Sequence, residues 1–96
     1  MGDLHQYNIE ERYEMANDVA QIVEEVNDAF FKKVEAKEVN GYLCVLDKRI
    51  DPFEADLEML EDSLAEVVEF IEQEFNVTLE VVNWLYRTVV YGVYEF

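Results

Sequence analysis

The stretch Asp51–Phe75, DPFEADLEMLEDSLAEVVEFIEQEF, decides how this chain is expected to fold. Asp51 is a suitable helix N-cap, Pro52 fits the first helical position, and Glu54 follows the cap by three residues, as in a capping box. Apolar residues then recur at spacings of three and four, which predicts one amphipathic helix over about 52–75. The predicted apolar stripe consists of Phe53, Leu57, Leu60, Leu64, Val67, Ile71 and Phe75.

The other faces of this segment are acidic. Residues 52–75 carry nine carboxylates and no Lys or Arg, which gives −9. A second predicted helix, over about 9–31, carries seven acids and one base, which gives −6, so these two segments hold −15 of the net charge of −16. Like charges four residues apart destabilise a helix by about 0.2–0.5 kcal/mol per pair. Folding therefore does not require these faces, and we expect them to serve a partner.

The segment between the two predicted helices contains a hairpin signal. Asn40-Gly41 lies between two runs of β-prone residues. Before the first predicted helix, residues 1–8 are a short polar lead-in. Asn-Gly suits a two-residue turn in which both residues need positive φ, so a hairpin is expected over about 34–46. In the alternative, the first helix continues to Glu38 and Gly41 belongs to its C-cap.

The end of the chain favours strands. Asn76 is suited to end the second helix, and the β-branched and aromatic residues that follow predict a β segment over about 77–95. The sequence does not place its turn, because neither Asn83-Trp84 nor Arg87-Thr88 suits a two-residue turn, and Gly92 is a candidate bulge. A helical alternative is disfavoured by the β-branched content. Its apolar positions would be Leu79, Val82, Tyr86, Val89 and Val93.

The predicted fold class is α+β, in one compact domain over 1–96. Its order is helix, hairpin, helix, hairpin, and a four-stranded antiparallel sheet would carry both acidic amphipathic helices on one face. The other face of the sheet would then be partly bare and apolar, which predicts a homodimer or a partner there. The residues expected on this dimer face are Tyr42, Leu46, Val82, Val90, Tyr94 and Phe96.

No arrangement of residues typical of an enzyme is visible. The only histidine, His5, lies near the N-terminus, and the only cysteine, Cys44, is expected to pack as a small hydrophobe. The chain lacks the Cys/His sets that bind zinc. A calcium loop beginning at Asp47 is excluded because Arg49 stands at a ligand position and Pro52 at the glycine position. We expect no catalysis, no metal and no cofactor.

The composition also bears on the compartment. No stretch approaches the roughly 18 apolar residues of a membrane span, and the N-terminus lacks a signal-peptide pattern. A single cysteine forms no intramolecular disulfide and fits a reducing compartment. We expect a cytoplasmic protein without a membrane partner, found in the host cytoplasm if it is phage-encoded.

The charge points to a class of partner. A surface at −16 repels phosphate, so direct nucleic-acid binding is not expected. Carboxylates in rows can instead imitate a phosphate backbone and block a basic nucleic-acid-binding protein or nuclease complex. In charge, size and amphipathic pattern, the chain resembles the acidic phage-encoded DNA mimics and the anti-restriction and anti-CRISPR proteins. The residues expected to bind the partner are Glu10, Glu14, Asp18, Glu25, Glu54, Glu58, Asp62, Glu66 and Glu69.

Other functions fit the same composition. An immunity protein or antitoxin that neutralises one basic toxin shares the electrostatics, but a few anchor residues would dominate its binding. An acidic dimeric adaptor would instead use the apolar sheet face. A solvated acidic surface, as in adaptation to high salt, would need no partner at all.

Overall fold

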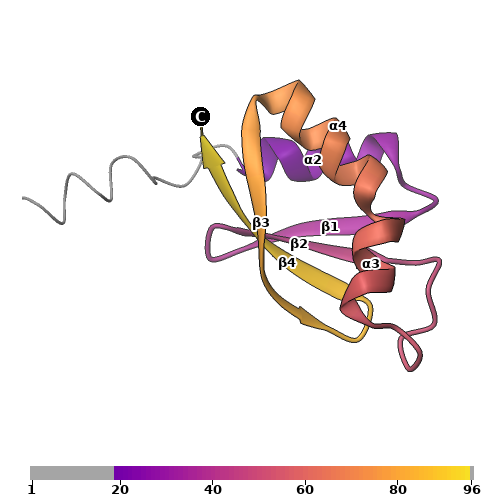
Figure 1. Ribbon diagram of the computed structural model, residues 1–96. Helices are drawn as coiled ribbons and strands as arrows, with labels where there is room; N and C mark the ends of the chain where they lie inside the picture. Colours follow the sequence, from indigo (N-terminus) through magenta and orange to yellow (C-terminus); the bar gives the residue numbers. More distant parts are fainter. Residues whose placement is uncertain (1–18, 96) are drawn as a thin grey trace, which may run out of the picture.

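The computed structural model describes residues 19–95. It is an α+β structure in which three helices accompany a four-stranded antiparallel sheet of order β1-β2-β4-β3 (Figure 1). The sheet is strongly twisted, so β1 and β2 run across β3 in that view. The elements are α2 (Val19–Ala29), β1 (Val34–Val39), β2 (Tyr42–Asp47), α3 (Leu57–Ser63), α4 (Ala65–Phe75), β3 (Val77–Leu85) and β4 (Thr88–Glu95).

The first two strands are joined by a two-residue turn. Asn40 and Gly41 have φ values of 53° and 87°, and Val39 faces Tyr42 across the turn. Both turn residues therefore have positive φ, as a tight hairpin turn of this kind requires. The first helix ends at Ala29 and not at 31, and the alternative in which it reaches Glu38 is wrong. Its predicted start at residue 9 lies outside the described residues.

The predicted helix over 52–75 begins later than the sequence indicated. Asp56 is the N-cap, with extended backbone, and its carboxylate accepts a hydrogen bond of 2.8 Å from the Met59 amide. Asp51 instead accepts a hydrogen bond of 2.9 Å from the Phe53 amide and, through its carbonyl, one from Glu54. Asp followed by Pro is equally a signature of a β-turn, and here the turn forms instead of the cap.

The helix is also interrupted at Leu64, where α3 ends and α4 begins. Backbone hydrogen bonds from Leu64 to Leu60 and from Val68 to Leu64 still span the interruption. The guanidinium of Arg49 donates to the carbonyl of Ser63 over 2.8 Å at this point. A side chain that binds a backbone carbonyl within a helix is a recognised cause of a bend. The sequence alone predicted one unbroken helix.

The last two strands turn at Tyr86-Arg87, a position that the sequence did not indicate. Leu85 faces Thr88 across the turn, and Tyr86 has a positive φ of 55°. The pairing register shifts between Val81 and Asn83, so the bulge is not at Gly92. A Cβ atom at Gly92 would lie 2.7 Å from the Tyr94 hydroxyl, so a larger residue there would displace the end of the Tyr94 side chain.

The core lies between the helices and one face of the sheet. The Phe30 and Phe70 rings contact each other edge to face at 5.3 Å and join α2 to α4. Phe53, which the sequence assigned to the apolar stripe, is 87% exposed because it precedes the helix. The fully buried residues of the core include Ile22, Val26, Leu43, Val45, Leu60, Leu64, Ile71, Val89 and Val93.

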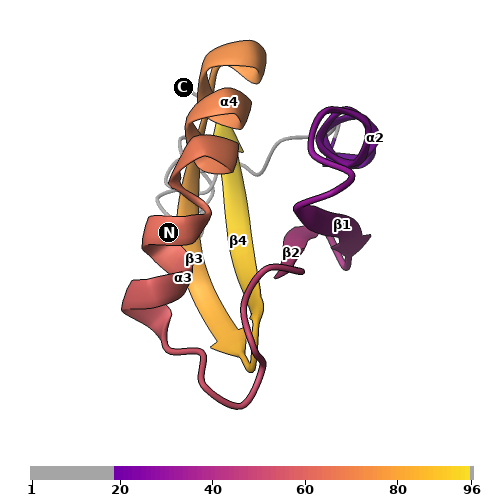
Figure 2. The same ribbon diagram turned by 90° about the vertical axis from the view of Figure 1, so that its right-hand side faces the viewer.

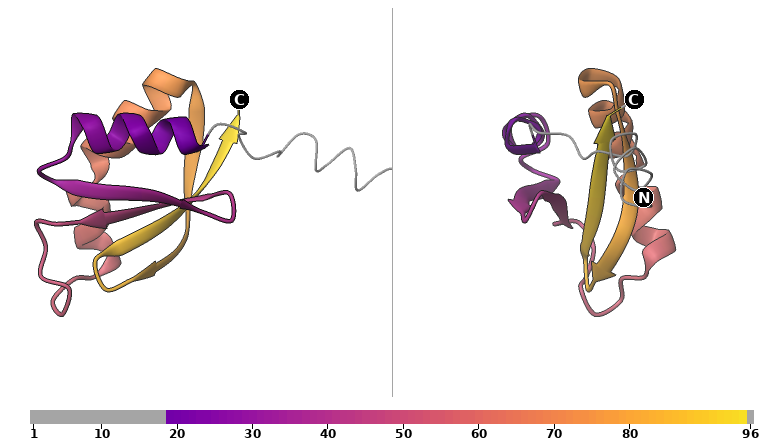
Figure 3. Two further views of the ribbon diagram at one scale, coloured as in Figure 1. Left: turned by 180° about the vertical axis from the view of Figure 1, so that it is seen from behind. Right: turned by 90° about the vertical axis from the view of Figure 1, so that its left-hand side faces the viewer.

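Each outer strand of the sheet is covered by one helix (Figures 2 and 3). On the β1 side, the amide group of Asn27 in α2 donates to the Ala36 carbonyl over 3.0 Å and accepts from the Ala36 amide over 2.7 Å. On the β3 side, Glu72 of α4 accepts a hydrogen bond of 3.0 Å from the Leu79 amide. These side chains satisfy backbone groups that an open edge would leave available for pairing with another strand.

The strand register separates the two faces of the sheet. The opposite face carries four of the residues predicted for the dimer face, and Val82 lies in the bulge and is exposed. Phe96 lies outside the described residues. The four residues on the opposite face are Tyr42, Leu46, Val90 and Tyr94.

Among residues 19–95, no helix has the length and apolarity to cross a membrane.

Candidate functional site

The structure distributes the predicted partner-binding carboxylates over several elements. Glu10, Glu14 and Asp18 lie outside the described residues. The other six are all exposed. Of these, Glu25 lies on α2, Glu54 in the loop before α3, Glu58 and Asp62 on α3, and Glu66 and Glu69 on α4.

Several carboxylates in the acidic segments serve the fold. Asp51 forms a turn and Asp56 caps α3, as described above. Glu72 covers the edge of β3, and Glu38 accepts a hydrogen bond of 2.7 Å from the Gly41 amide in the first hairpin. Such hydrogen bonds, in which one partner is charged, are among the stronger ones in proteins. Acidic composition alone therefore overstates the number of carboxylates available to a partner.

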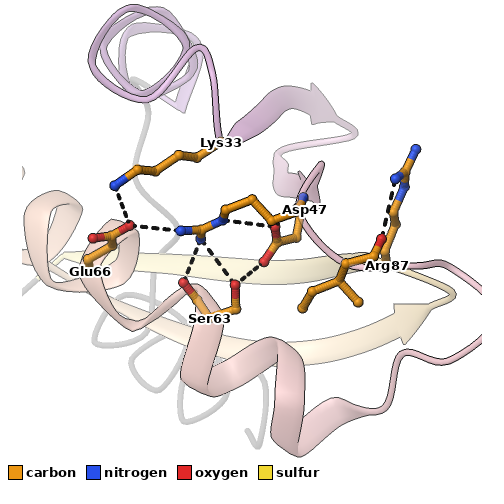
Figure 4. A network of polar contacts seen from close by, with 7 residues as sticks. Lys33, Asp47, Ser63, Glu66 and Arg87 are labelled. Carbon is orange, nitrogen blue, oxygen red and sulfur yellow. Dashed lines mark hydrogen bonds and ion pairs between the residues drawn. The ribbon is translucent and has the colours of Figure 1, made fainter.

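Glu66 belongs to a polar network that the sequence did not reveal (Figure 4). Its Oε1 atom lies 3.2 Å from Lys33 Nζ and 3.3 Å from Arg49 Nη1. Arg49 also contacts Ser63 and Asp47, so the network joins the β2–α3 loop to the interruption between α3 and α4. The hydrogen bond from Lys33 lowers the pKa of Glu66, and the positive charges of Lys33 and Arg49 add to this effect. Glu66 is thus paired within the chain.

Asp47 is the only fully buried charged residue among the described residues. The Ser63 hydroxyl, the Arg49 backbone amide and the Arg49 Nε atom all donate to its carboxylate. Burying a carboxylate is costly unless such partners are present, so the network is needed to keep Asp47 in the core. Asp47 is the last residue of β2, one residue beyond the predicted hairpin, and no sequence pattern linked it to Ser63.

Three of the predicted carboxylates remain available on the outer side of α3 and α4. Glu58, Asp62 and Glu69 project away from the buried stripe that includes Leu60 and Ile71, since their positions lie roughly opposite on the helix. Within residues 19–95, none of the three takes part in a hydrogen bond or ion pair of the structure. This group, Glu58, Asp62 and Glu69, is called the outer carboxylates below.

A groove of about 380 Å³ lies between α4 and β3, beside Glu69. Glu61 and Glu72 add two further carboxylates to its lining, and Val68 and Leu79 make its floor apolar. The buried Tyr91 also lines it. Burial raises the pKa of Tyr91, and the negative charges of Glu61 and Asp47 raise it further. The groove combines an apolar floor with a negative rim, which suits the stem and head of a Lys or Arg side chain.

Basic residues are absent from the three described helices. The six bases of the described residues lie on β1 or in connections, and four of them either belong to the network at Glu66 or adjoin one of its members in the chain. The positive and negative charges are therefore separated along the chain. The four are Lys32, Lys33, Lys48 and Arg49.

A second surface feature includes part of the sheet face on which the sequence predicted a homodimer or a partner. An apolar groove of about 610 Å³ lies at the end of the sheet next to the turn between β3 and β4, where residues of the face opposite the core meet the loop before α3. Two of its residues, Leu46 and Val90, were expected on a dimer face. The exposed run Trp84-Leu85-Tyr86 and the misassigned Phe53 were the sequence signals that could have revealed it. The apolar groove is defined here by Leu46, Phe53, Trp84, Leu85, Tyr86 and Val90.

Two observations concern metal binding and the cysteine. Residues 19–95 contain no cluster of three His, Cys, Asp or Glu side chains arranged to hold a metal ion. Cys44 is buried, and burial raises the pKa of its thiol even though Lys37 acts in the opposite direction. A raised pKa disfavours the reactive thiolate. His5 lies outside the described residues.

No family model, curated protein or solved structure matches this chain. The function must therefore be argued from the surfaces described above.

Proposed function

We propose that this protein is a non-enzymatic acidic inhibitor that presents carboxylates in place of nucleic-acid phosphates. Its partner would be a basic nucleic-acid-binding protein or a nuclease complex, as in an anti-restriction or anti-CRISPR role. The observation that carries the proposal is the charge of α3 and α4: seven carboxylates and no base, with the outer carboxylates unengaged within the described residues. Such a surface is complementary to the basic channel of a protein that binds DNA or RNA.

The density of charge supports this choice. At 1.5 Å per residue, Leu57–Phe75 extends over about 28 Å, so its seven carboxylates occur about once in every 4 Å of helix axis, and the five that remain without Glu66 and Glu72 about once in every 6 Å. One strand of duplex DNA carries a phosphate about every 3.4 Å. The spacing of the carboxylates is of the same order as that of the phosphates, so a basic channel would meet charge of the same sign and of the same order per unit length.

The groove between α4 and β3 gives the proposal a point of contact. A Lys or Arg side chain of the partner would lay its aliphatic stem along Val68 and Leu79 and its cationic head beside Glu61 and Glu69. The guanidinium group of Arg can donate two parallel hydrogen bonds to one carboxylate, so Arg is the better occupant. Each such contact would lose strength as salt rises.

The experiment begins with capture of partners. The purified protein is immobilised, incubated with host lysate at low and at high salt, and the bound proteins are identified by mass spectrometry. The proposal expects a nucleic-acid-binding protein or nuclease that is released by salt and displaced by duplex DNA. Capture of a single protein that resists salt and ignores DNA would contradict it.

A matched pair of charge variants then tests the surface. The first variant reverses the outer carboxylates: Glu58→Lys, Asp62→Lys and Glu69→Lys. Glu66 is left unchanged because it is paired with Lys33 and Arg49. A control variant reverses three exposed carboxylates on strands: Glu35→Lys, Glu80→Lys and Glu95→Lys.

Both variants carry a net charge of −10, because each reversal adds two charges to the original −16. The first is expected to lose at least about tenfold in affinity for the captured partner, and the control much less, because contacts at the surface outweigh long-range attraction once salt screens it. Equal losses in the two variants would show that only net charge matters, which would contradict a binding surface on α3 and α4.

A second candidate function is favoured by the apolar groove. An immunity protein or antitoxin that neutralises one specific basic toxin would depend on a few anchor residues, and Phe53 and Leu85 are suited to that role. The two functions differ in how the loss of affinity is distributed. Single substitutions along α3 and α4 should weaken a phosphate mimic gradually, whereas one or two substitutions in the groove should abolish the binding of a specific inhibitor.

A further inference from the structure

We propose that the apolar groove binds an amphipathic basic segment of the partner protein. Apolar side chains of that segment would enter the groove, and its Lys or Arg side chains would meet the carboxylates of the loop Asp51–Asp56. The basic character of the segment rests on the proposed function, but the groove is a separate surface from the outer carboxylates. It would contribute the part of the affinity that salt does not weaken.

The groove exposes apolar side chains that the core does not use. Phe53 is 87% exposed, Leu85 is 67% exposed and Tyr86 is 56% exposed. They meet at one end of the sheet, where the rings of Phe53 and Tyr86 contact each other edge to face at 6.1 Å. Contiguous exposed apolar residues of this kind mark interaction sites, whereas single exposed ones do not. Aromatic residues at such a rim are typical anchors of protein interfaces.

The backbone conformation of Tyr86 indicates that its aromatic side chain has a role other than forming the turn. A φ of 55° is uncommon for a residue other than glycine, asparagine or aspartate, and it strains the backbone of a tyrosine. The conformation is held by the next residue, because the Arg87 carbonyl accepts a hydrogen bond of 2.9 Å from the Asp47 amide. Asn or Gly would adopt this turn at lower cost. Folding alone therefore does not explain the tyrosine.

The charges around the groove select a basic occupant. Pro52 and Phe53 line the groove, and the same loop exposes the carboxylates of Asp51, Glu54 and Asp56, of which the two aspartates use one oxygen each for the turn and the helix cap. The base at the groove, Arg87, donates to the Ile50 carbonyl over 3.3 Å and is partly buried. A second copy of this chain would bring the same acidic loop and another net charge of −16, and would be repelled. A basic segment would be attracted.

Trp84 provides a direct test, because it is the single tryptophan of the chain and lines the groove. The probe is a synthetic amphipathic peptide with Leu and Phe on one side and Lys on the other. Two control peptides carry Glu in place of Lys, or Ser in place of Leu and Phe. We expect the first peptide to cause a saturable blue shift of the Trp84 emission, and both controls to bind at least about tenfold more weakly.

Variants of the protein exclude non-specific attraction between the peptide and an acidic surface. Phe53→Ser combined with Leu85→Ser should weaken binding of the Lys-containing peptide at least about tenfold. Both side chains are exposed, so their loss spares the core. Phe31→Ser removes another exposed phenylalanine, which is 60% exposed and lies outside the groove, and should leave the affinity unchanged. Equal shifts with the Lys and Glu peptides, or equal losses in the two protein variants, would overturn the proposal.

Two further outcomes separate this proposal from others. A dimer that forms without peptide, and that Phe53→Ser with Leu85→Ser disrupts in analytical ultracentrifugation, would assign the groove to a second copy and overturn the proposal. If the captured partner binds through the outer carboxylates while Trp84 responds to no peptide, the groove proposal alone fails. If Trp84 responds as expected while the captured partner ignores Glu58, Asp62 and Glu69, the phosphate-mimic function alone fails.

Discussion

Ser63 donates its hydroxyl to the buried carboxylate of Asp47, sixteen residues earlier in the chain. The contact joins the end of β2 to the last residue of α3, at the point where the helix is interrupted. It therefore positions α4, which carries Glu69, relative to the sheet. The same carboxylate holds Arg49, which in turn reaches Glu66. The arrangement of the acidic surface therefore depends on the buried carboxylate of Asp47.

Ser63→Ala is expected to lower the free energy of unfolding by about 1–3 kcal/mol, because it removes a hydrogen-bond donor from a buried charged group. Urea unfolding measures the change. Gln73→Ala, on the exposed side of α4, is the control and should stay within about 0.5 kcal/mol of the original protein. Equal stability of both variants would show that Arg49 alone satisfies Asp47.

Glu66 should titrate at a lower pH than in the unfolded chain, because Lys33 and Arg49 lower its pKa. A pKa lowered by folding contributes stability above the unfolded value, and this contribution is lost as pH falls through the folded value. Lys33→Met should raise the pKa of Glu66, since the hydrogen bond from Lys33 is the largest cause of the shift. Carbon-detected NMR of the Glu66 carboxyl measures this pKa, and Lys37→Met is the control. A pKa of Glu66 that is the same in Lys33→Met as in the original protein would contradict the pairing.

Asn27→Ala should cost about 1–3 kcal/mol of stability, because the Ala36 amide and carbonyl lose their partner at the edge of β1. The amide of Ala36 should exchange with solvent faster, and the variant should aggregate more readily through the opened edge. Hydrogen-exchange NMR and light scattering test both effects. Gln21→Ala, on the exposed side of α2, is the control, and similar exchange at Ala36 in both variants would contradict the role of Asn27.

Asp62→Lys should raise the free energy of unfolding while it weakens binding to the partner. Glu58 and Asp62 are like charges four residues apart in α3, and the change converts their repulsion into attraction. The expected gain is about 0.4–1 kcal/mol at low salt, and it should shrink in 1 M NaCl. Asp62→Asn should give about half of the gain. Loss of stability in Asp62→Lys would show that the acidic face serves the fold.

Much of the fold followed from local patterns. The alternation of β-prone residues around Asn40-Gly41 and the apolar stripe from Leu60 to Ile71 predicted the α+β class and the antiparallel sheet. Helix boundaries were less certain from the sequence, because Asp51-Pro52 is compatible with both a helix start and a β-turn. The structure formed the turn, and this placed Phe53 at the surface.

The sequence by itself determined the periodic elements and the excess of negative charge, because both depend on residues that lie close together in the chain. Only the tertiary structure decided which carboxylates are available. Glu66 is paired with Lys33, 33 residues away, and Glu72 binds an amide of β3. Contacts of this kind depend on how the helices lie against the sheet. No local pattern encodes that arrangement, and the apolar groove arises from it in the same way.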